Sequence, residues 1–173
     1  MLDYTKLSSK YLVRRMSERD AERILALCSG NSLFYQYAKA EPTLEQVLED
    51  LRITPPGVDA KDKYYLGFFD GETLIAVMDL IDGYPNHETA FIGFFMVDAA
   101  FQGWGTGSFI ISETADYLRR IGKTAIRLGI DAGNPQSNAF WRKNGFITIA
   151  EVDKGGNTIL LAEKTLIDGQ IVL

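Results

Sequence analysis

The chain has 173 residues, a length that suits one domain with a sizeable core. Its composition, 46% hydrophobic and 24% charged, is ordinary for a soluble globular protein, and its net charge of −5 argues against a broad basic surface for nucleic acid. One cysteine, Cys28, excludes an internal disulfide and a cysteine-based metal cluster, and we expect no metal site. No apolar run is long enough for a membrane span and the N-terminus lacks the apolar core of a signal peptide, so we expect a cytoplasmic protein without membrane partners.

The first third of the chain predicts a strand followed by two helices. Residues Tyr11–Arg15 are an extended segment, and Ser17 is a fair N-cap for apolar residues that recur at helical spacing as far as Cys28. A second helix begins at Thr43, within a Thr-Leu-Glu-Gln capping box, and is stopped by a Pro-Pro-Gly turn. The intervening Asn31–Pro42 is predicted to be irregular. Its aromatic residues either pack within a loop or line a substrate pocket.

The middle of the chain predicts a β-hairpin and a buried strand. Two β-rich runs, Tyr64–Phe69 and Thr73–Ile81, flank Asp70-Gly71, a dipeptide that favours tight hairpin turns. A polar loop then leads to Phe91–Val97, which is too short for a typical helix and is rich in aromatic and branched residues. We therefore expect Phe91–Val97 to be a central strand.

A glycine-rich turn follows that strand and precedes a helix. The turn reads Gln102-Gly103-Trp104-Gly105-Thr106-Gly107, and Ser108–Ile121 has apolar residues at helical spacing. The first amide groups of a helix lack intrahelical partners and lie at the positive end of its dipole, and glycines let an anion approach the backbone closely. The turn is thus a candidate phosphate site, although glycine content alone is equally compatible with a tight connection that binds nothing.

The last third predicts a strand, a helix and a second hairpin. Ala125–Asp131 should lie parallel to Phe91–Val97, because the helix between them forms a right-handed crossover. Pro135–Asn144 is the next helix, and Phe146–Val152 and Thr158–Lys164 form the hairpin.

Two motifs in this part of the chain stand in a defined order. The first is Q/R-x-x-G-x-G, formed by Gln102, Gly105 and Gly107. The second, over residues 134–146, is similar to Asn-x-x-Ala-x-x-Phe-Tyr-x-Lys-x-Gly-Phe, with Ser137 where alanine is usual and Trp141 where tyrosine is usual. Together they cover about a third of the chain, which here resembles the GNAT (Gcn5-related) N-acetyltransferase superfamily.

The resemblance implies a fold class and a co-substrate. It implies an α/β fold, a single GNAT-like domain over residues 1–173. Its central sheet would be mixed and mostly antiparallel, with about seven strands, a parallel splayed pair in the middle and about four flanking helices. It also implies acetyl-CoA as co-substrate, with the pyrophosphate on the glycine-rich turn and the pantetheine arm in the V between the splayed strands.

The resemblance further implies the residues of the site. The backbone amides of the turn would bind the pyrophosphate, Phe95 and Val97 would pair with the pantetheine amides, and the backbone N–H of Val97 would be the oxyanion donor. The full set expected to bind acetyl-CoA is Phe95, Met96, Val97, Gln102, Gly103, Trp104, Gly105, Thr106, Gly107, Ser108, Asn134, Ser137, Phe140 and Trp141.

The side chains that the superfamily uses for acid–base catalysis are not present at the corresponding positions of this chain. Many members of the superfamily use the tyrosine of the second motif as the acid, but Trp141 has no acidic proton to donate. Some carry a glutamate on the central strand, where this chain has Phe91. The candidate bases are Glu88, just before the central strand, and Asp79 in the preceding strand. Direct attack by the amine, with water carrying the proton, accounts for the chemistry without either carboxylate.

These observations predict an N-acetyltransferase that moves an acetyl group from acetyl-CoA to a primary amine of a small molecule or peptide, by direct attack in a ternary complex. The alternative is a catalytically weak acyl-CoA-binding or regulatory module. A nucleotide-binding α/β protein is a third reading. The C-terminal hairpin, with Ile159–Ala162 and the tail Ile171–Leu173, could join a partner's sheet in a homodimer or pack on its own domain. The sequence does not identify the acceptor.

Overall fold

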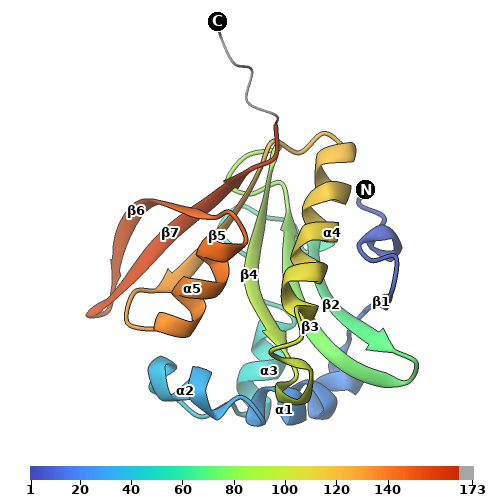
Figure 1. Ribbon diagram of the computed structural model, residues 1–173, viewed down its shortest axis with the longest axis vertical. Helices are drawn as coiled ribbons and strands as arrows, with labels where there is room; N and C mark the ends of the chain where they lie inside the picture. Colours follow the sequence, from blue (N-terminus) through green and yellow to red (C-terminus); the bar gives the residue numbers. More distant parts are fainter. Residues whose placement is uncertain (168–173) are drawn as a thin grey trace, which may run out of the picture.

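The computed structural model describes residues 1–167 and contains one seven-stranded sheet with the order β1-β2-β3-β4-β5-β7-β6 (Figure 1). Neighbouring strands are antiparallel except for β4 and β5, which are parallel. This arrangement confirms the mixed sheet with a central parallel pair that the sequence predicts. The strands are β1 Leu12–Arg15, β2 Lys63–Asp70, β3 Thr73–Asp82, β4 Thr89–Val97, β5 Ala125–Asp131, β6 Ile147–Lys154 and β7 Asn157–Thr165.

Five α-helices accompany the sheet within residues 1–167, one more than predicted. None of these helices combines the length and the hydropathy that a bilayer span requires. The additional helix is α2, in a segment predicted to be irregular. Because α2 is only seven residues long, packing stabilises it more than propensity does, and its Phe34 and Tyr35 pack against the core. The helices are α1 Ala21–Ser29, α2 Ser32–Ala38, α3 Leu44–Asp50, α4 Thr106–Arg120 and α5 Pro135–Lys143.

The β2–β3 hairpin differs from its prediction by one residue in the turn. Asp70 pairs with Thr73, so the two turn residues are Gly71 and Glu72 instead of Asp70 and Gly71. The pairing register shifts between Phe68 and Phe69, where Ile75 of β3 is the extra residue of a β-bulge. Gly71 has a φ of 60°, the left-handed conformation that a tight hairpin turn requires.

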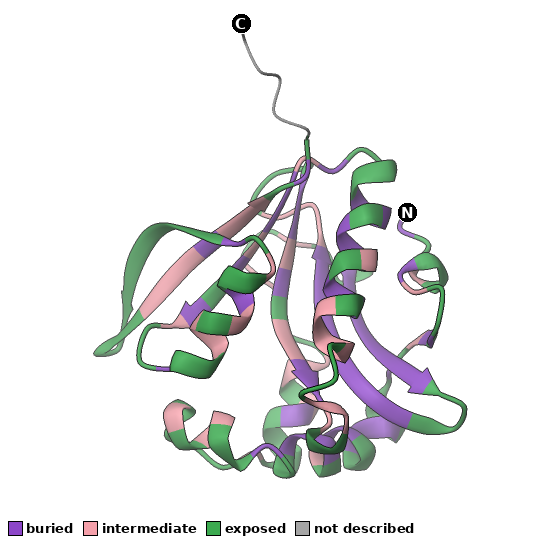
Figure 2. Cartoon of the chain, in the orientation of Figure 1, coloured by how far each residue is buried: buried purple, intermediate pink, exposed green. Residues whose placement is uncertain are grey.

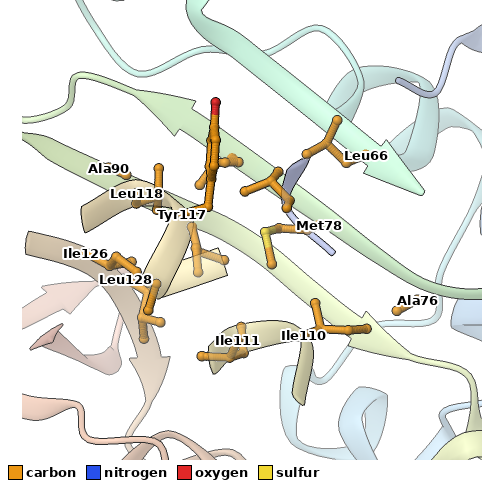
Figure 3. Close-up of a cluster of buried hydrophobic side chains, with 14 of the residues drawn as sticks. Leu66, Ala76, Met78, Ala90, Ile110, Ile111, Tyr117, Leu118, Ile126 and Leu128 are labelled. Carbon is orange, nitrogen blue, oxygen red and sulfur yellow. The ribbon is translucent and has the colours of Figure 1, made fainter. Parts of the chain in front are cut away.

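Alternate residues of β2 and β3 face two different hydrophobic clusters, one on each side of the sheet. Leu66 and Met78 are fully buried in the cluster formed with α4, whose Ile110 and Leu118 lie beside them (Figure 3). The opposite face is covered by α1 and α3, where Val77 and its neighbours pack with Ile24 and Val47, among others. The sheet is therefore the middle layer of three.

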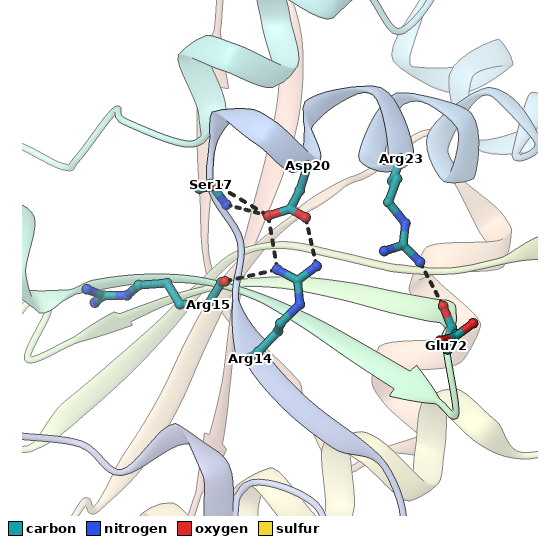
Figure 4. Close-up of polar contacts among 6 residues, drawn as sticks. All are labelled: Arg14, Arg15, Ser17, Asp20, Arg23 and Glu72. Carbon is teal, nitrogen blue, oxygen red and sulfur yellow. Dashed lines mark hydrogen bonds and ion pairs between the residues drawn. The ribbon is translucent and has the colours of Figure 1, made fainter.

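A group of polar contacts fixes the start of α1 (Figure 4). The Arg14 guanidinium donates to both carboxylate oxygens of Asp20, at 3.0 and 2.7 Å, and the Ser17 N–H donates to the same carboxylate at 2.8 Å. Arg14 holds the pKa of Asp20 below its ordinary value. Arg23 of α1 donates to the Glu72 carbonyl in the β2–β3 turn at 2.7 Å. These contacts join β1, α1 and the hairpin.

The C-terminal edge of the sheet is much less covered. Every residue of β6 is exposed, whereas β2 and β3 are buried along almost all of their length (Figure 2). β7 pairs with both β5 and β6, so the segment Ile159–Ala162 lies inside the sheet of its own chain. The tail Ile171–Leu173, for which the sequence leaves open a partner's sheet or its own domain, lies outside the described residues.

Candidate functional site

The sheet opens between β4 and β5. The two strands pair only from Thr89 with Ala125 to Ile92 with Leu128, and they diverge beyond that point (Figure 1). A cavity of about 390 Å³ occupies the opening. Its walls come from β4, β5, the glycine-rich turn, the first turn of α4 and α5, with two residues from the α1–α2 region. The residues that line it are Asn31, Phe34, Ile92, Gly93, Phe94, Phe95, Met96, Val97, Gln102, Gly103, Gly105, Thr106, Gly107, Ser108, Leu128, Gly129, Ile130, Asp131, Gln136, Ser137, Phe140, Trp141 and Lys143.

The last residues of β4 turn backbone groups toward this opening. The Asp98 N–H donates to the Ile75 carbonyl of β3 at 2.8 Å. Every second residue at this end of β4, counted back from Asp98, therefore directs its backbone N–H and C=O groups toward β3. Phe95 and Val97 belong to the other set, and their backbone groups face the side from which β5 has diverged. A strand edge without a partner strand can pair with the amides of an extended ligand.

The glycine-rich turn leads directly into α4 at the mouth of the cavity. Gly105 is the N-cap of α4 and has a φ of 80°, a conformation that L side chains rarely adopt. A Cβ atom placed at Gly105 would meet no heavy atom within 4 Å, so the space beside the backbone is open. The first amides of this 15-residue helix, at the positive end of its dipole, therefore adjoin open space suited to an anion.

The side chain of Gln102 fixes the turn against β4. Its Nε2 donates to the Val97 carbonyl at 2.8 Å and to Oδ1 of Asn31. Asn31 is buried and donates to the carbonyls of Leu27, at 3.0 Å, and Val97, at 3.2 Å. The sequence does not mark Asn31 as a site residue, because it belongs to a Ser-Gly-Asn cluster whose residue types are already accounted for by the end of a helix.

Four aromatic side chains connect β4 to α5. Phe95 stacks on Phe140 with ring centroids 6.0 Å apart, and Trp141 meets Phe140 at 4.9 Å and Phe146 at 5.0 Å. Trp141 is 8% exposed and reaches the cavity wall from within this cluster. Trp104 is different, since it is 82% exposed and does not line the cavity.

α5 is capped and tied to α4 by asparagine side chains. Asn134 is buried, and its Oδ1 accepts from the Ser137 N–H at 3.1 Å, so it serves as the helix N-cap and does not line the cavity. Asn144, at the other end of α5, donates to Ser108 Oγ of α4 at 3.1 Å and to the Phe140 carbonyl at 2.8 Å. The two helices that border the cavity are thereby held together.

The two carboxylates predicted as bases lie in different places. Asp79 is buried on β3, forms an ion pair with Lys63 at 2.7 Å, and lies directly beside Gly93 of the cavity wall. Burial raises its pKa, although Lys63 acts in the opposite direction. Glu88 is exposed, precedes the paired end of β4 and does not line the cavity. Within residues 1–167, no three His, Cys, Asp or Glu side chains are placed to hold a metal ion.

A sheet split in the middle, with a helix N-terminus at the mouth of the split, defines an α/β protein that can hold an extended, phosphate-bearing ligand across its central strands. The model of the Acetyltransferase (GNAT) family matches residues 24–146, most of the chain. The protein belongs to this family, whose enzymes use acetyl-CoA. The match confirms the resemblance seen in the two sequence motifs.

Solved structures show the same fold. An acetyltransferase from Thermus thermophilus is 23% identical with a TM-score of 0.72, over 90% of this chain and 97% of that one. The PaiA N-acetyltransferase from Thermoplasma acidophilum, solved with coenzyme A, is 20% identical with a TM-score of 0.64, over 90% and 98%. The yncA protein from Salmonella typhimurium, solved with acetyl-CoA, is 18% identical with a TM-score of 0.61, over 93% and 96%. A search of curated proteins found no match.

Proposed function

We propose that the protein is an acetyl-CoA-dependent N-acetyltransferase that acts on a primary amine of a small molecule or peptide. The observation that carries the proposal is the position of the glycine-rich turn. It places the N-terminus of α4, with open space beside Gly105, at one end of the cavity between β4 and β5. An anion-binding turn and a free strand edge in one cavity match the two ends of an acyl-CoA, a pyrophosphate and an arm that contains amides.

Binding of acetyl-CoA would involve both walls of the opening. The amides from Gln102 to Ser108 would contact the pyrophosphate, while the backbone of Phe95 would pair with the pantetheine amides. The Val97 carbonyl already accepts from Gln102 and Asn31, which leaves the Val97 N–H as the group to stabilise negative charge on the acetyl oxygen. Phe140 and Trp141 would pack along the arm.

Acetyl-CoA supplies an activated acetyl group with a thiolate as leaving group. In the proposed step the neutral amine nitrogen attacks the acetyl carbon, the new C–N bond forms and the C–S bond breaks. The excess proton on nitrogen passes to water or to Asp79, and the thiolate takes a proton from water. Trp141 provides no acid, so the leaving thiolate must depart without a protein proton donor at that position.

The buried, apolar surroundings of Trp141 favour one second candidate, a catalytically weak acyl-CoA-binding module. The two candidates differ in turnover. An assay that measures free thiol released from acetyl-CoA, over a panel of primary amines, should show amine-dependent release and an acetylated product by mass spectrometry. Tight binding of acetyl-CoA without amine-dependent release across the panel would favour the binding module. Absence of acetyl-CoA binding would reject both.

A further inference from the structure

The carboxylate of Asp79 has a hydrogen-bond partner on only one of its oxygens. Oδ1 accepts from Lys63 Nζ at 2.7 Å, and the two residues are 9% and 5% exposed. Among residues 1–167, no donor to Oδ2 is present. Oδ2 lacks a donor but is not fully shielded from solvent, so a ligand can reach it and would be stabilised by donating a hydrogen bond in these largely buried surroundings.

The position of Oδ2 is tied to the absence of a side chain at residue 93. Asp79 pairs with Phe94 and Leu80 pairs with Ile92, so Gly93 is the extra residue of a β-bulge. A Cβ atom built on Gly93 would lie 2.7 Å from Oδ2, which is closer than real Cβ contacts allow. Gly93 is itself exposed and lines the cavity. The carboxylate therefore adjoins the cavity at a gap that any other residue would fill.

The charges around Asp79 favour a cation. Lys63 and Tyr65 face it from β2, and Asp50 acts on it from α3. Burial raises the pKa of Tyr65, which stays a neutral phenol. Among the described residues 1–167, Lys63 is the one positive charge that acts on Asp79, and Asp50 is a second carboxyl group. Two carboxyl groups thus share one lysine, and Oδ2 of Asp79 is left without a donor.

Two aromatic rings line the cavity on the same side of the sheet. Phe94 is paired with Asp79 and shares its face, and Phe34 of α2 meets Phe94 edge to face with ring centroids 6.0 Å apart. An apolar group beside these rings would lose little on leaving water. The cavity therefore offers an acidic point next to an aromatic wall.

We propose that the acceptor is a cationic primary amine on a small apolar body, with its ammonium group on Asp79 Oδ2 at the Gly93 gap and its apolar part against Phe34 and Phe94. This inference rests on the proposed function, because it names the acceptor class of the same site. Lys63 is a positioning residue in this account. It holds Oδ1 and so directs Oδ2 toward the gap.

Three probes test the charge and shape of the acceptor. They are 2-phenylethylamine, its uncharged match 2-phenylethanol, and phenylalanine, which adds a carboxylate beside the amine. Calorimetry with the protein–CoA complex measures binding without requiring turnover, and thiol release from acetyl-CoA gives KM and kcat separately. We expect 2-phenylethylamine to bind and to be acetylated, and the other two to bind roughly tenfold more weakly or not at all.

Two variants test the anchor in different ways. Asp79→Asn keeps the shape of the side chain and removes its charge. Gly93→Ala retains both Lys63 and Asp79 and places a methyl group against Oδ2. Both should raise the KM for 2-phenylethylamine roughly tenfold or more, while the Kd for CoA stays within about twofold of wild type. If Asp79→Asn does not fold because Lys63 is left unpaired, Gly93→Ala still carries the test.

The outcomes separate this inference from the proposed function. If CoA binds and amines are acetylated but neither variant changes the KM for 2-phenylethylamine, the proposed role of Asp79 in binding the amine is wrong. The proposed acetyltransferase function is then unaffected. Equal affinity for 2-phenylethylamine and 2-phenylethanol would also overturn the anchor. If CoA does not bind to wild type, the proposed function fails on its own evidence. Amine binding that both variants weaken, even without turnover, supports the anchor.

Discussion

The two halves of the sheet, on either side of the opening, are built differently. Strands β2 and β3 have hydrophobic clusters on both faces and are buried over nearly all of their residues. Strands β5 to β7 end in β6, which is exposed at every position. We therefore expect the buried contacts of β2 and β3 to contribute far more to the folding free energy than those of β6, while β5 forms the second wall of the cavity. The predictions below test this division, from the largest expected effect to the smallest.

A core truncation in the N-terminal half should be severe. Phe68 of β2 is fully buried, so Phe68→Ala should lower the free energy of unfolding by about 3–5 kcal/mol, measured by urea denaturation. The matched change at an exposed aromatic, Trp104→Ala, should leave stability within about 0.5 kcal/mol of wild type. Similar losses for the two variants would show that burial does not distinguish these positions.

Acid should weaken the contacts that hold α1. The pKa of Asp20 lies below its ordinary value of 3.8 because Arg14 donates to its carboxylate. The folded protein therefore binds this proton less tightly than the unfolded chain. The resulting stability is fully present above about pH 3.8 and is lost as the pH falls through the folded pKa.

Asp20→Asn should accordingly cost about 1.5–3 kcal/mol at pH 7, and the difference from wild type should shrink in acid. Asp116→Asn, which alters an exposed carboxylate on α4, is the control and should change stability by less than about 1 kcal/mol. Urea denaturation at a series of pH values measures both. A difference between Asp20→Asn and wild type that is constant with pH would contradict the role of this ion pair.

The contact that joins α4 to α5 should matter less for stability and more for binding. Asn144→Ala removes the hydrogen bonds to Ser108 and to the Phe140 carbonyl, and we expect a loss of about 1–2 kcal/mol. CoA affinity should fall several-fold, since both helices border the cavity. Asn138→Ala is the control, because its donors also serve α5 but do not reach α4. Equal loss of CoA affinity in the two variants would argue against the link.

The smallest effect is expected on β6. Ile149 is 42% exposed, so Ile149→Thr should change the free energy of unfolding by less than about 0.5 kcal/mol and leave CoA affinity unchanged. Chemical denaturation and calorimetry measure the two quantities. A large loss of stability would show that β6 is covered in solution, for example by a second copy of the chain.

The same division explains what the sequence predicts well. Regular patterns recovered Ala125–Asp131 as a strand with the observed bounds, and the helix crossover predicted that it lies parallel to β4. The resemblance supplied the seven-stranded mixed sheet. α2 was missed because its aromatic residues have no helical pattern of their own and are held by contacts with α1 and β4. The register shift near the turn, where Phe69 pairs with Leu74 and Phe68 with Ala76, has no clear sequence signal.

Some residues of the candidate site could be predicted from the sequence and others could not. Residues within contiguous motifs, such as Gly105 and Phe140, could be read from the sequence and lie on the cavity. A residue brought there by folding, such as Asn31, could not, because its importance depends on what lies opposite it. A glycine within a strand, such as Gly93, is a local sign of a bulge or a close backbone approach, and the bulge is present, but that Asp79 lies beside it depends on the pairing register of two strands.

The measurement that tests the central claim most directly is calorimetric titration of CoA and acetyl-CoA into wild type and Gly105→Trp. The substitution would fill the open space at the N-terminus of α4. Gly122→Trp is the matched control, since Gly122 also has a positive φ and open space but lies beyond the other end of α4. We expect micromolar binding by wild type and Gly122→Trp, and none by Gly105→Trp that is folded by circular dichroism. Absence of binding by wild type, or undiminished binding by Gly105→Trp, would contradict the account.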